Sequence, residues 1–211
     1  MVTSNKDLMT QAREALSGRW GLAVGTFFVY TFIMVALNNP LFSWSGISSG
    51  ALYKITISGN LILLLIGGAL TLGASTFALA IARKEEANLK MIFSGFKYYG
   101  KTLGLYLLMI LFVILWLLLI VPGIIAAISY SLAFFLMSDD PNIGAMEAID
   151  KSKKMMYGYK WKFFCLGLRF FGWFLLGILS LGIGFLWIIP YMYVSYAKFY
   201  EDVKANYVEE Q

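Results

Sequence analysis

The stretch from Thr102 to Ser138 carries no charged side chain, and the pair Pro122-Gly123 lies near its middle. As a single helix this stretch extends for roughly 55 Å, whereas the hydrocarbon core of a bilayer is only about 30 Å thick. Proline and glycine are the residues at which such a segment turns most readily. The stretch therefore predicts two apolar helices that form a hairpin within a membrane, with the break at Pro122 and Gly123.

Composition extends this prediction to the whole chain. Of the 211 residues, 60% are hydrophobic and 14% are charged, whereas soluble domains average about 45–50% apolar and about 25% charged residues. Apolar stretches that predict helices cover residues 20–37, 59–82, 102–121, 123–138, 163–180 and 184–199. We therefore expect an all-α integral membrane protein, one domain over residues 1–211, with six transmembrane helices arranged as three hairpins.

The basic residues predict how these helices are oriented, because Lys and Arg near span ends are retained in the cytoplasm. Of the 17 Lys and Arg residues, all but Lys54 and Arg169 lie on one side of the expected membrane. The 12 acidic residues lie on that side too. Both termini are therefore expected in the cytoplasm. The net charge of +5 then describes a mixed cytoplasmic face, which does not indicate nucleic-acid binding.

An internal repeat accompanies the hairpins. One gapless shift aligns Gly95 with Gly158 and Asp139 with Asp202. We divide the chain into units of about 4–83, 86–139 and 141–202, each an amphipathic segment followed by a hairpin. Apolar residues recur at helical spacing in these segments: Leu8, Ala12, Ala15 and Leu16; Leu89, Ile92, Phe93 and Phe96; Ile143, Met146, Ile149 and Met156.

These three segments are too short or too polar to span a membrane, so we expect interfacial helices on the cytoplasmic leaflet. The alternative is that they pack beneath the bundle as a cytoplasmic cap. Their expected ends follow known capping patterns. Ser4 and Asp7 have capping-box spacing, Asp140 caps a helix that begins at Pro141, and Gly18, Gly95 and Gly158 terminate helices.

Arg169 is the charged residue that lies well inside an expected span, about 10 Å from its cytoplasmic end. An ionisable group inside a membrane is a functional hypothesis by default, here a contact with a lipid phosphate or an anionic substrate. The alternative is an arginine that extends to the headgroups, or binds carbonyls at a neighbouring helix break.

The last expected span is rich in tyrosine. Tyr193 and Tyr196 lie on one helical face, which predicts either a substrate-lining face or an interfacial belt with interhelical hydrogen bonds. Together with Arg169 they are the candidate ligand or lipid contacts. Further helix breaks are expected at Gly182, Gly184 and Pro190. Small residues in the first two spans, including Gly21 and Gly25, predict close helix packing.

The chain shows no motif of a known catalytic, cofactor-binding or metal site. It has one cysteine and no histidine, which excludes the common zinc and haem ligand sets. Asp139 and Asp140 are adjacent carboxylates at the end of the fourth span, where a structural role for Asp140 suffices. We therefore expect a protein that is not an enzyme and has no cofactor.

The chain resembles a family of uncharacterised bacterial integral membrane proteins, domain of unknown function 975. The resemblance rests on Val121-Pro-Gly-Ile-Ile, Ser138-Asp-Asp-Pro141, Gly158-Tyr-Lys-Trp161 and Gly182-Ile-Gly184, with Ala15-Leu-Ser-Gly-Arg-Trp20 near the start. It covers nearly the whole chain and implies a helical protein of the bacterial cytoplasmic membrane. It implies no reaction.

Two functional hypotheses follow. In the first, the protein binds or transports a lipid-like or amphipathic molecule, or protects the membrane against one, with Arg169 and the tyrosines lining the contact. In the second, it is a membrane scaffold or an accessory subunit of a transporter or enzyme complex, and it binds through residues 143 to 157. Membrane lipids are expected partners in both hypotheses, and other membrane proteins are partners in the second.

Overall fold

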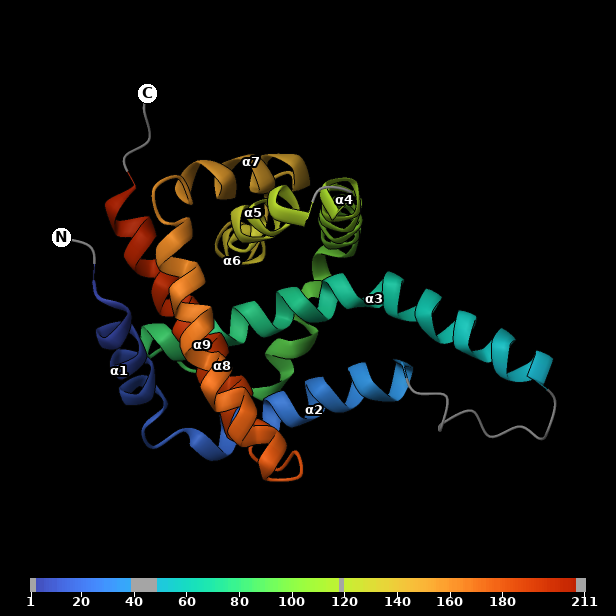
Figure 1. Ribbon diagram of the computed structural model, residues 1–211, viewed down its shortest axis with the longest axis horizontal. Coiled ribbons are helices and arrows are strands. Elements are labelled where there is room, and N and C mark those ends of the chain that lie inside the picture. The colour runs from blue at the N-terminus through green and yellow to red at the C-terminus, as the bar shows by residue number, and fades with distance from the viewer. Residues whose placement is uncertain (1–2, 39–48, 118–119, 208–211) are drawn as a thin grey trace.

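The computed structural model describes residues 3–38, 49–117 and 120–207, and every regular element in those residues is a helix (Figure 1). In chain order they are α1 (Asn5–Leu16), α2 (Trp20–Asn38), α3 (Ser49–Arg83), the 3₁₀ helix η2 (Leu89–Tyr98), α4 (Tyr99–Leu117), α5 (Ile120–Tyr130), α6 (Ala133–Asp139), α7 (Ala145–Met155), α8 (Lys160–Leu179) and α9 (Phe185–Asn206). The expected all-α class is confirmed.

Within the described residues, four segments are long and apolar enough to cross a membrane: Trp20–Leu37, Ile62–Arg83, Leu89–Val113 and Lys160–Leu179. Gly123–Asp139 is a shorter apolar segment, and it is interrupted where α5 gives way to α6. Ser131 contributes to this interruption because its backbone N–H and its hydroxyl both donate to the carbonyl of Ile128. The span expected at 123–138 is therefore two short helices and not one.

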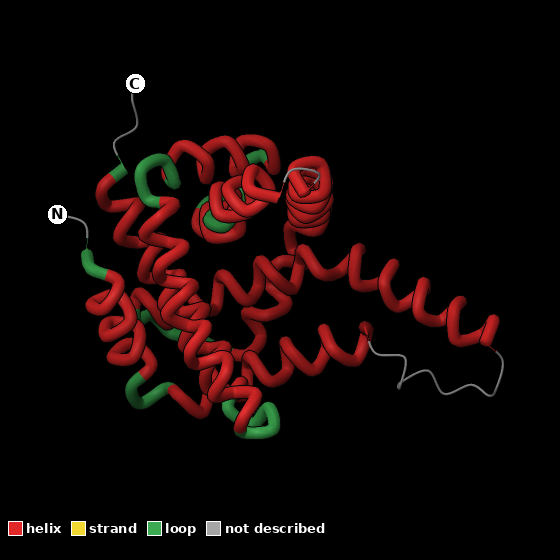
Figure 2. The backbone as a smooth tube through the Cα atoms, viewed as in Figure 1, coloured by secondary structure: helices red, strands yellow, loops and turns green. Residues whose placement is uncertain are grey.

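Consecutive apolar helices pack in pairs, α2 with α3, α4 with α5, and α8 with α9. These pairs diverge from one another and do not form a parallel bundle. In Figure 1, α3 runs along the long axis of the molecule and the α8–α9 hairpin runs across it. Figure 2 shows α4 nearly end-on in the same view.

The helix α3 is the centre of the fold. Within Ile62–Arg83, 61% of residues are buried, against 11–17% in the other three candidate spans. It contacts η2, α9, α2, α4 and α6. Its side chains Phe77, Ala78 and Ile81 lie in the main apolar core with residues of α1, α6, α8 and α9. Few residues of the other candidate spans are buried within the protein.

Two glycines allow η2 to lie directly on α3. A Cβ atom at Gly73 lies 1.9 Å from the carbonyl oxygen of Ile92, and one at Gly95 lies 2.1 Å from that of Ala69. Both distances are far below van der Waals contact, so only glycine permits this backbone approach. Gly95 was expected to end a helix. It lies within η2 instead and serves as a packing position.

The apolar stripe expected on α1 is buried against other parts of the protein. Leu8, Ala12, Ala15 and Leu16 are all buried, and α1 packs along α9. Ser4 caps the helix as expected, because its hydroxyl accepts from the backbone N–H of Asp7 at 3.2 Å. Other helices of the protein therefore cover this stripe, and it does not face lipid. This burial agrees with the alternative in which the segment packs beneath the bundle.

The third amphipathic segment begins later than expected. Asp140 does not cap a helix at Pro141. Its carboxylate accepts from the N–H of Asn142 at 2.9 Å and stabilises a turn before α7. The carboxylate of Glu147 accepts from the N–H of Gly144 at 3.3 Å, so this pair begins α7. Gly158, with φ +81°, follows α7 in the left-handed conformation expected of a terminator.

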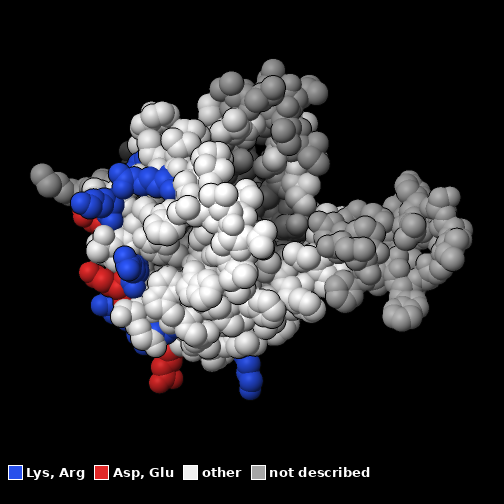
Figure 3. Space-filling model, turned by 60° about the horizontal axis from the view of Figure 1, so that its bottom comes forward, with Lys and Arg blue, Asp and Glu red and all other residues white. Residues whose placement is uncertain are grey.

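Charged residues gather at one end of the molecule (Figure 3). We call the region around Arg83, Asp139, Glu201, Asp202 and Lys204 the charged end. These residues lie at or near the last residues of α3, α6 and α9. The three helices therefore bring their ends together there, and the α2–α3 and α8–α9 pairs extend away from that end (Figure 1).

Substitution of Gly73 by alanine should destabilise the fold. The added methyl overlaps the carbonyl of Ile92, and the backbone shift that relieves such overpacking typically costs about 1–3 kcal/mol. Gly25→Ala is the matched control, because a Cβ at Gly25 meets no atom within 4 Å and alanine favours the helix. Thermal unfolding in detergent, followed by circular dichroism, should show a lower Tm for Gly73→Ala alone. Equal Tm values for the two variants would show that the close contact is absent.

Candidate functional site

Arg169, the foremost candidate from sequence, lies on α8 with an exposed side chain. It lines none of the three hollows described below. The exposed position agrees with the alternative of an arginine that reaches toward headgroups, because an enclosed ligand site requires a buried or cavity-facing guanidinium.

The two candidate tyrosines lie in packing contacts. The Tyr193 hydroxyl lies 3.4 Å from that of Tyr30 on α2, and its ring centroid is 4.8 Å from that of Phe27. The ring of Tyr196 lies 5.0 Å from that of Phe163 on α8. The structure therefore does not bring Arg169, Tyr193 and Tyr196 into one site. The tyrosines connect α9 to α2 and to α8, as interhelical contacts do.

The expected helix breaks have different local structures. Pro122 and Gly123 lie in the first turn of α5, where proline is tolerated; the two residues before α5 lie outside the described part of the chain. Gly182, with φ +90°, and Gly184 lie in the connection between α8 and α9. Pro190 lies within α9, which continues on both sides of it.

Asp139 is the centre of an ion-pair cluster at the charged end. Its carboxylate lies 2.6 Å from the guanidinium of Arg83, which also lies 2.7 Å from the carboxylate of Glu201. The hydroxyl of Tyr200 donates to Asp139 at 3.0 Å, and the ammonium of Lys204 pairs with the same oxygen. The cluster therefore connects the last residues of α3 and α6 with α9.

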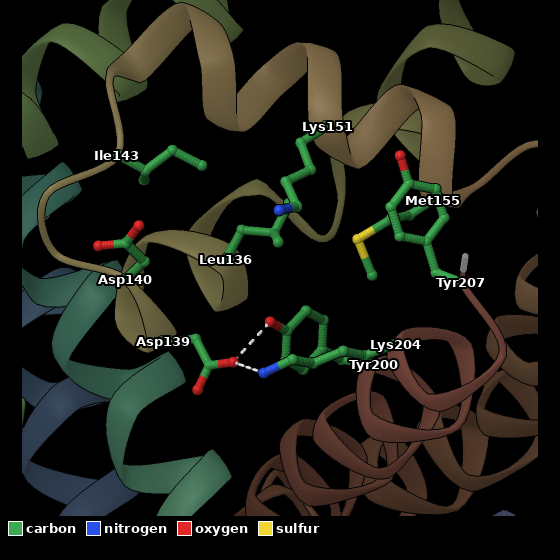
Figure 4. A pocket seen from close by; sticks show the side chains of 9 residues that line it. All are labelled: Leu136, Asp139, Asp140, Ile143, Lys151, Met155, Tyr200, Lys204 and Tyr207. Carbon is green, nitrogen blue, oxygen red and sulfur yellow. Dashed lines mark hydrogen bonds and ion pairs between the residues drawn. The ribbon is translucent and has the colours of Figure 1, made fainter. Parts of the chain in front are cut away.

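A pocket of about 430 Å³ lies beside this cluster, between α6, α7 and α9 (Figure 4). Its walls include Asp139, Asp140, Lys151, Tyr200 and Lys204. Figure 4 shows Tyr200 and Lys204 converging on one carboxylate oxygen of Asp139, while Asp140 points away from them. The adjacent carboxylates therefore do not face a common point. A carboxylate with three donors has a structural role, and this geometry supplies no paired acid and base.

The two carboxylates that the repeat aligns have lowered pKa values. Burial acts to raise the pKa of Asp139, but hydrogen bonds from Lys204, Arg83 and Tyr200 outweigh it and leave that pKa below its ordinary value. Burial also acts to raise the pKa of Asp202, but hydrogen bonds from Lys162 and Thr3 outweigh it and leave that pKa below its ordinary value. The ammonium of Lys162 lies 2.7 Å from Asp202. Both groups are therefore more stable as carboxylates in the folded chain.

A second hollow, of about 200 Å³, combines one cation with an aromatic wall. Arg13 of α1 and Trp20 at the start of α2 line it together with Trp173, Trp187 and Tyr191 from the α8–α9 hairpin. The ring of Tyr191 lies 6.4 Å from those of both Trp20 and Trp173. We call this hollow the tryptophan pocket. Three indoles and one guanidinium are groups suited to an amphipathic molecule with an anionic end.

Sequence reasoning missed the tryptophan pocket because its residues come from four helices, α1, α2, α8 and α9. Tryptophan near span ends was the available signal, since indoles favour membrane interfaces. The pocket joins residues from the beginning and the end of the chain, and no repeat or spacing relates them. Their convergence depends on the packing of α1 along α9.

A third hollow, of about 280 Å³, is an apolar groove between α2 and α9. Its lining includes Phe27, Phe28 and Val35 on α2, with Phe185 and Ile189 on α9. The adjacent residue Ile188 lines the tryptophan pocket. The apolar groove and the tryptophan pocket therefore adjoin the same turn of α9.

The fold and its hollows define an all-helical protein with several helices apolar enough to cross a membrane. A model of the family described as "Protein of unknown function (DUF975)" matches residues 1–128 and 110–207. The chain therefore belongs to the DUF975 family, and the resemblance seen in its sequence is confirmed. No curated protein and no solved structure matches it.

Acid should destabilise the protein through the charged end. The carboxylates of Asp139 and Asp202 have folded pKa values below the unfolded value of about 3.9, so their stabilisation is present above that pH and is lost as the pH falls through the folded values. Asp139→Asn should lower the free energy of unfolding at pH 7 by about 1–3 kcal/mol. The variant should also lose less stability than wild type when the pH falls from about 5 to about 3, because it no longer carries the Asp139 carboxylate that is protonated in this range.

The matched control is Asp140→Asn. It removes the neighbouring carboxylate but keeps a side-chain oxygen that can accept from Asn142. Denaturation in detergent at a series of pH values should leave this control close to wild type. A pH profile of Asp139→Asn that coincides with that of wild type would contradict the assigned role of the cluster.

Proposed function

We propose that the chain is a non-enzymatic, multi-pass protein of the bacterial cytoplasmic membrane that binds an anionic, amphipathic, lipid-like molecule. The charged end, with both termini, lies in the cytoplasm, as the distribution of basic residues favours. Transport and membrane protection are activities that such binding would serve. Six crossings stay a prediction, since four segments of the described chain have the required length and composition.

The tryptophan pocket carries this proposal. Arg13 supplies a permanent positive charge beside indole and phenol rings, and a guanidinium binds phosphate or carboxylate oxygens through paired donors. The adjoining apolar groove is lined almost wholly by apolar side chains. An anionic head at Arg13 and an apolar chain in or near the groove would match the chemistry of the two hollows. The binding residues proposed here therefore replace Arg169, Tyr193 and Tyr196.

Exposed apolar side chains support a lipid environment. Leu111 and Leu115 on α4, Phe28 and Phe32 on α2, and Leu179 on α8 are all exposed. A soluble monomer rarely exposes contiguous apolar patches of more than a few hundred Å². Lipid hydrocarbon is the solvent in which such surfaces carry no penalty.

Loss of the Arg13 charge should weaken binding of an anionic lipid. A basic residue near an anionic membrane surface contributes about 1 kcal/mol, so Arg13→Gln should reduce the affinity for phosphatidylglycerol by roughly fivefold. Native mass spectrometry of the detergent-solubilised protein, titrated with phosphatidylglycerol, measures this change. Lys6→Gln is the matched control, because Lys6 is an exposed cation on the same helix that does not line the pocket. An equal loss of affinity in the two variants would show that Arg13 acts only through nonspecific attraction between charges, and not through the tryptophan pocket.

The second candidate function is a scaffold or accessory subunit of a transporter or enzyme complex. It is favoured by Tyr157, the last residue of the segment 143–157, and by Trp161 in the first turn of α8, which are 83% and 74% exposed. Exposed aromatic residues are enriched at protein interfaces. For this function, Tyr157→Ser combined with Trp161→Ser should abolish recovery of a stoichiometric protein partner by affinity purification from membranes, and Arg13→Gln should not. Recovery of the protein with lipid alone would exclude the scaffold.

A further inference from the structure

The helix α1 packs along α9 and also contacts α8. Near the charged end, the side-chain amide of Asn5 donates to the carbonyl of Lys162 at 2.8 Å. Near the other end of α1, Arg13 shares the tryptophan pocket with Trp173 and Trp187. The polar helix therefore reaches the level of these two tryptophans on the hairpin. Figure 1 shows α1 beside the hairpin.

The part of the hairpin that α1 accompanies does not fit in hydrocarbon. The exposed residues of α1 include four charged side chains: Lys6, Asp7, Arg13 and Glu14. A charged side chain at the centre of a membrane helix costs about 2.5–3.5 kcal/mol even on the most favourable scale. A helix with four of them on its surface stays in water or at the headgroups. Hydrocarbon can therefore begin only beyond Arg13, near Trp173 and Trp187.

The remaining length of the hairpin is too short to cross a bilayer. From Trp173 to the end of α8 at Leu179, the helix rises about 9 Å. The hydrocarbon core is about 30 Å thick, so one leaflet contributes about 15 Å. Tryptophans favour the boundary between hydrocarbon and headgroups, which is where Trp173 and Trp187 would then lie. A hairpin inserted to this level ends within the first leaflet.

The tip of the hairpin has the properties that burial in hydrocarbon requires. Leu179, Leu181 and Ile183 are exposed, Leu181 to 94%. A tip that faced water on the far side of a membrane would have no need of such side chains. Connections between spans in water are commonly rich in polar residues, whereas residues 179–186 include a single polar side chain, that of Ser180.

The backbone of the tip is hydrogen-bonded within itself. Each backbone N–H from residue 180 to residue 188 donates to a carbonyl or hydroxyl oxygen of the same hairpin. The hydroxyl of Ser180 accepts from the N–H of Gly184 at 2.8 Å and donates to the carbonyl of Gly177 at 2.8 Å. Hydrocarbon offers no hydrogen-bond partner, so a backbone immersed in it must satisfy its N–H groups internally.

We infer that the α8–α9 hairpin dips into one leaflet of the bilayer and does not cross it. The apolar tip, residues 179–183, lies in the hydrocarbon of that leaflet, and Trp173 and Trp187 lie at its boundary. Arg169 lies one helical turn before Trp173 and is at the headgroup level, where an exposed guanidinium meets lipid phosphates. This inference rests on the proposed membrane location, and it replaces two of the six expected crossings.

Spin-label accessibility at two positions tests the inference. In a Cys165→Ser background, which removes the single cysteine, nitroxides are attached at Leu181→Cys or Phe171→Cys and the protein is reconstituted in phosphatidylethanolamine–phosphatidylglycerol vesicles. Both side chains are exposed, so the labels should be tolerated. We expect the ratio of oxygen access to nickel-chelate access to be several-fold higher at position 181 than at position 171. Leu179→Cys and Ile183→Cys repeat the measurement if Leu181→Cys does not fold.

Two other outcomes overturn the inference in different ways. A full crossing would place position 171 in hydrocarbon and position 181 in water, where a membrane-impermeant maleimide would label it from outside intact cells. That outcome removes the dip but leaves the proposed membrane function standing. High nickel access at both positions would show that this hairpin is not inserted, and it would contradict the proposed function as well. Loss of phosphatidylglycerol binding by Arg13→Gln is measured separately.

Discussion

Charged side chains are costly to remove from water, and they are concentrated at one end of this molecule, apart from its most apolar helices (Figure 3). A cluster of acidic and basic side chains joins the ends of α3 and α6 to α9. At this junction Arg83 contacts Asp139 and Glu201 at 2.6 and 2.7 Å. Partly exposed ion pairs contribute little net stability. A partner left unpaired in a partly buried site is costly, however, so the cluster selects the register in which the three helix ends coincide.

Backbone contact fixes the position of α3 within this arrangement. Gly73 and Gly95 let η2 and α3 approach so closely that each added Cβ atom would overlap a carbonyl of the other segment. Such a contact tolerates little sliding, because neighbouring positions carry side chains. The approach holds η2 against the buried part of α3, and α4 continues directly from η2. The direction of the α4–α5 pair therefore depends on two glycines rather than on an apolar stripe alone.

Much of the local structure was predictable from sequence, and most of its partners were not. Helical spacing identified Leu8, Ala12 and Leu16 as one face, and those residues are buried. Periodicity shows that a face is apolar but not what covers it, so the sequence favoured a lipid interface for this face, with packing beneath the bundle as the alternative. The glycine at Gly95 resembles a terminator in sequence, because backbone overlap with a distant helix leaves no local pattern. The tryptophan pocket is hidden for the same reason, since Arg13 and Trp187 are brought together only by tertiary packing.

Depth in a membrane is likewise a tertiary property. Counted along the sequence, Arg169 lies inside an apolar stretch and invites a functional interpretation. In the folded chain the α8–α9 hairpin carries the polar helix α1 along its side, and the side chain of Arg169 is exposed. A helix can lie no deeper in hydrocarbon than the charged neighbour attached to it allows. In the inferred placement, the residues that limit the depth of α8 lie at the other end of the chain, and the hydropathy of α8 alone does not reveal them.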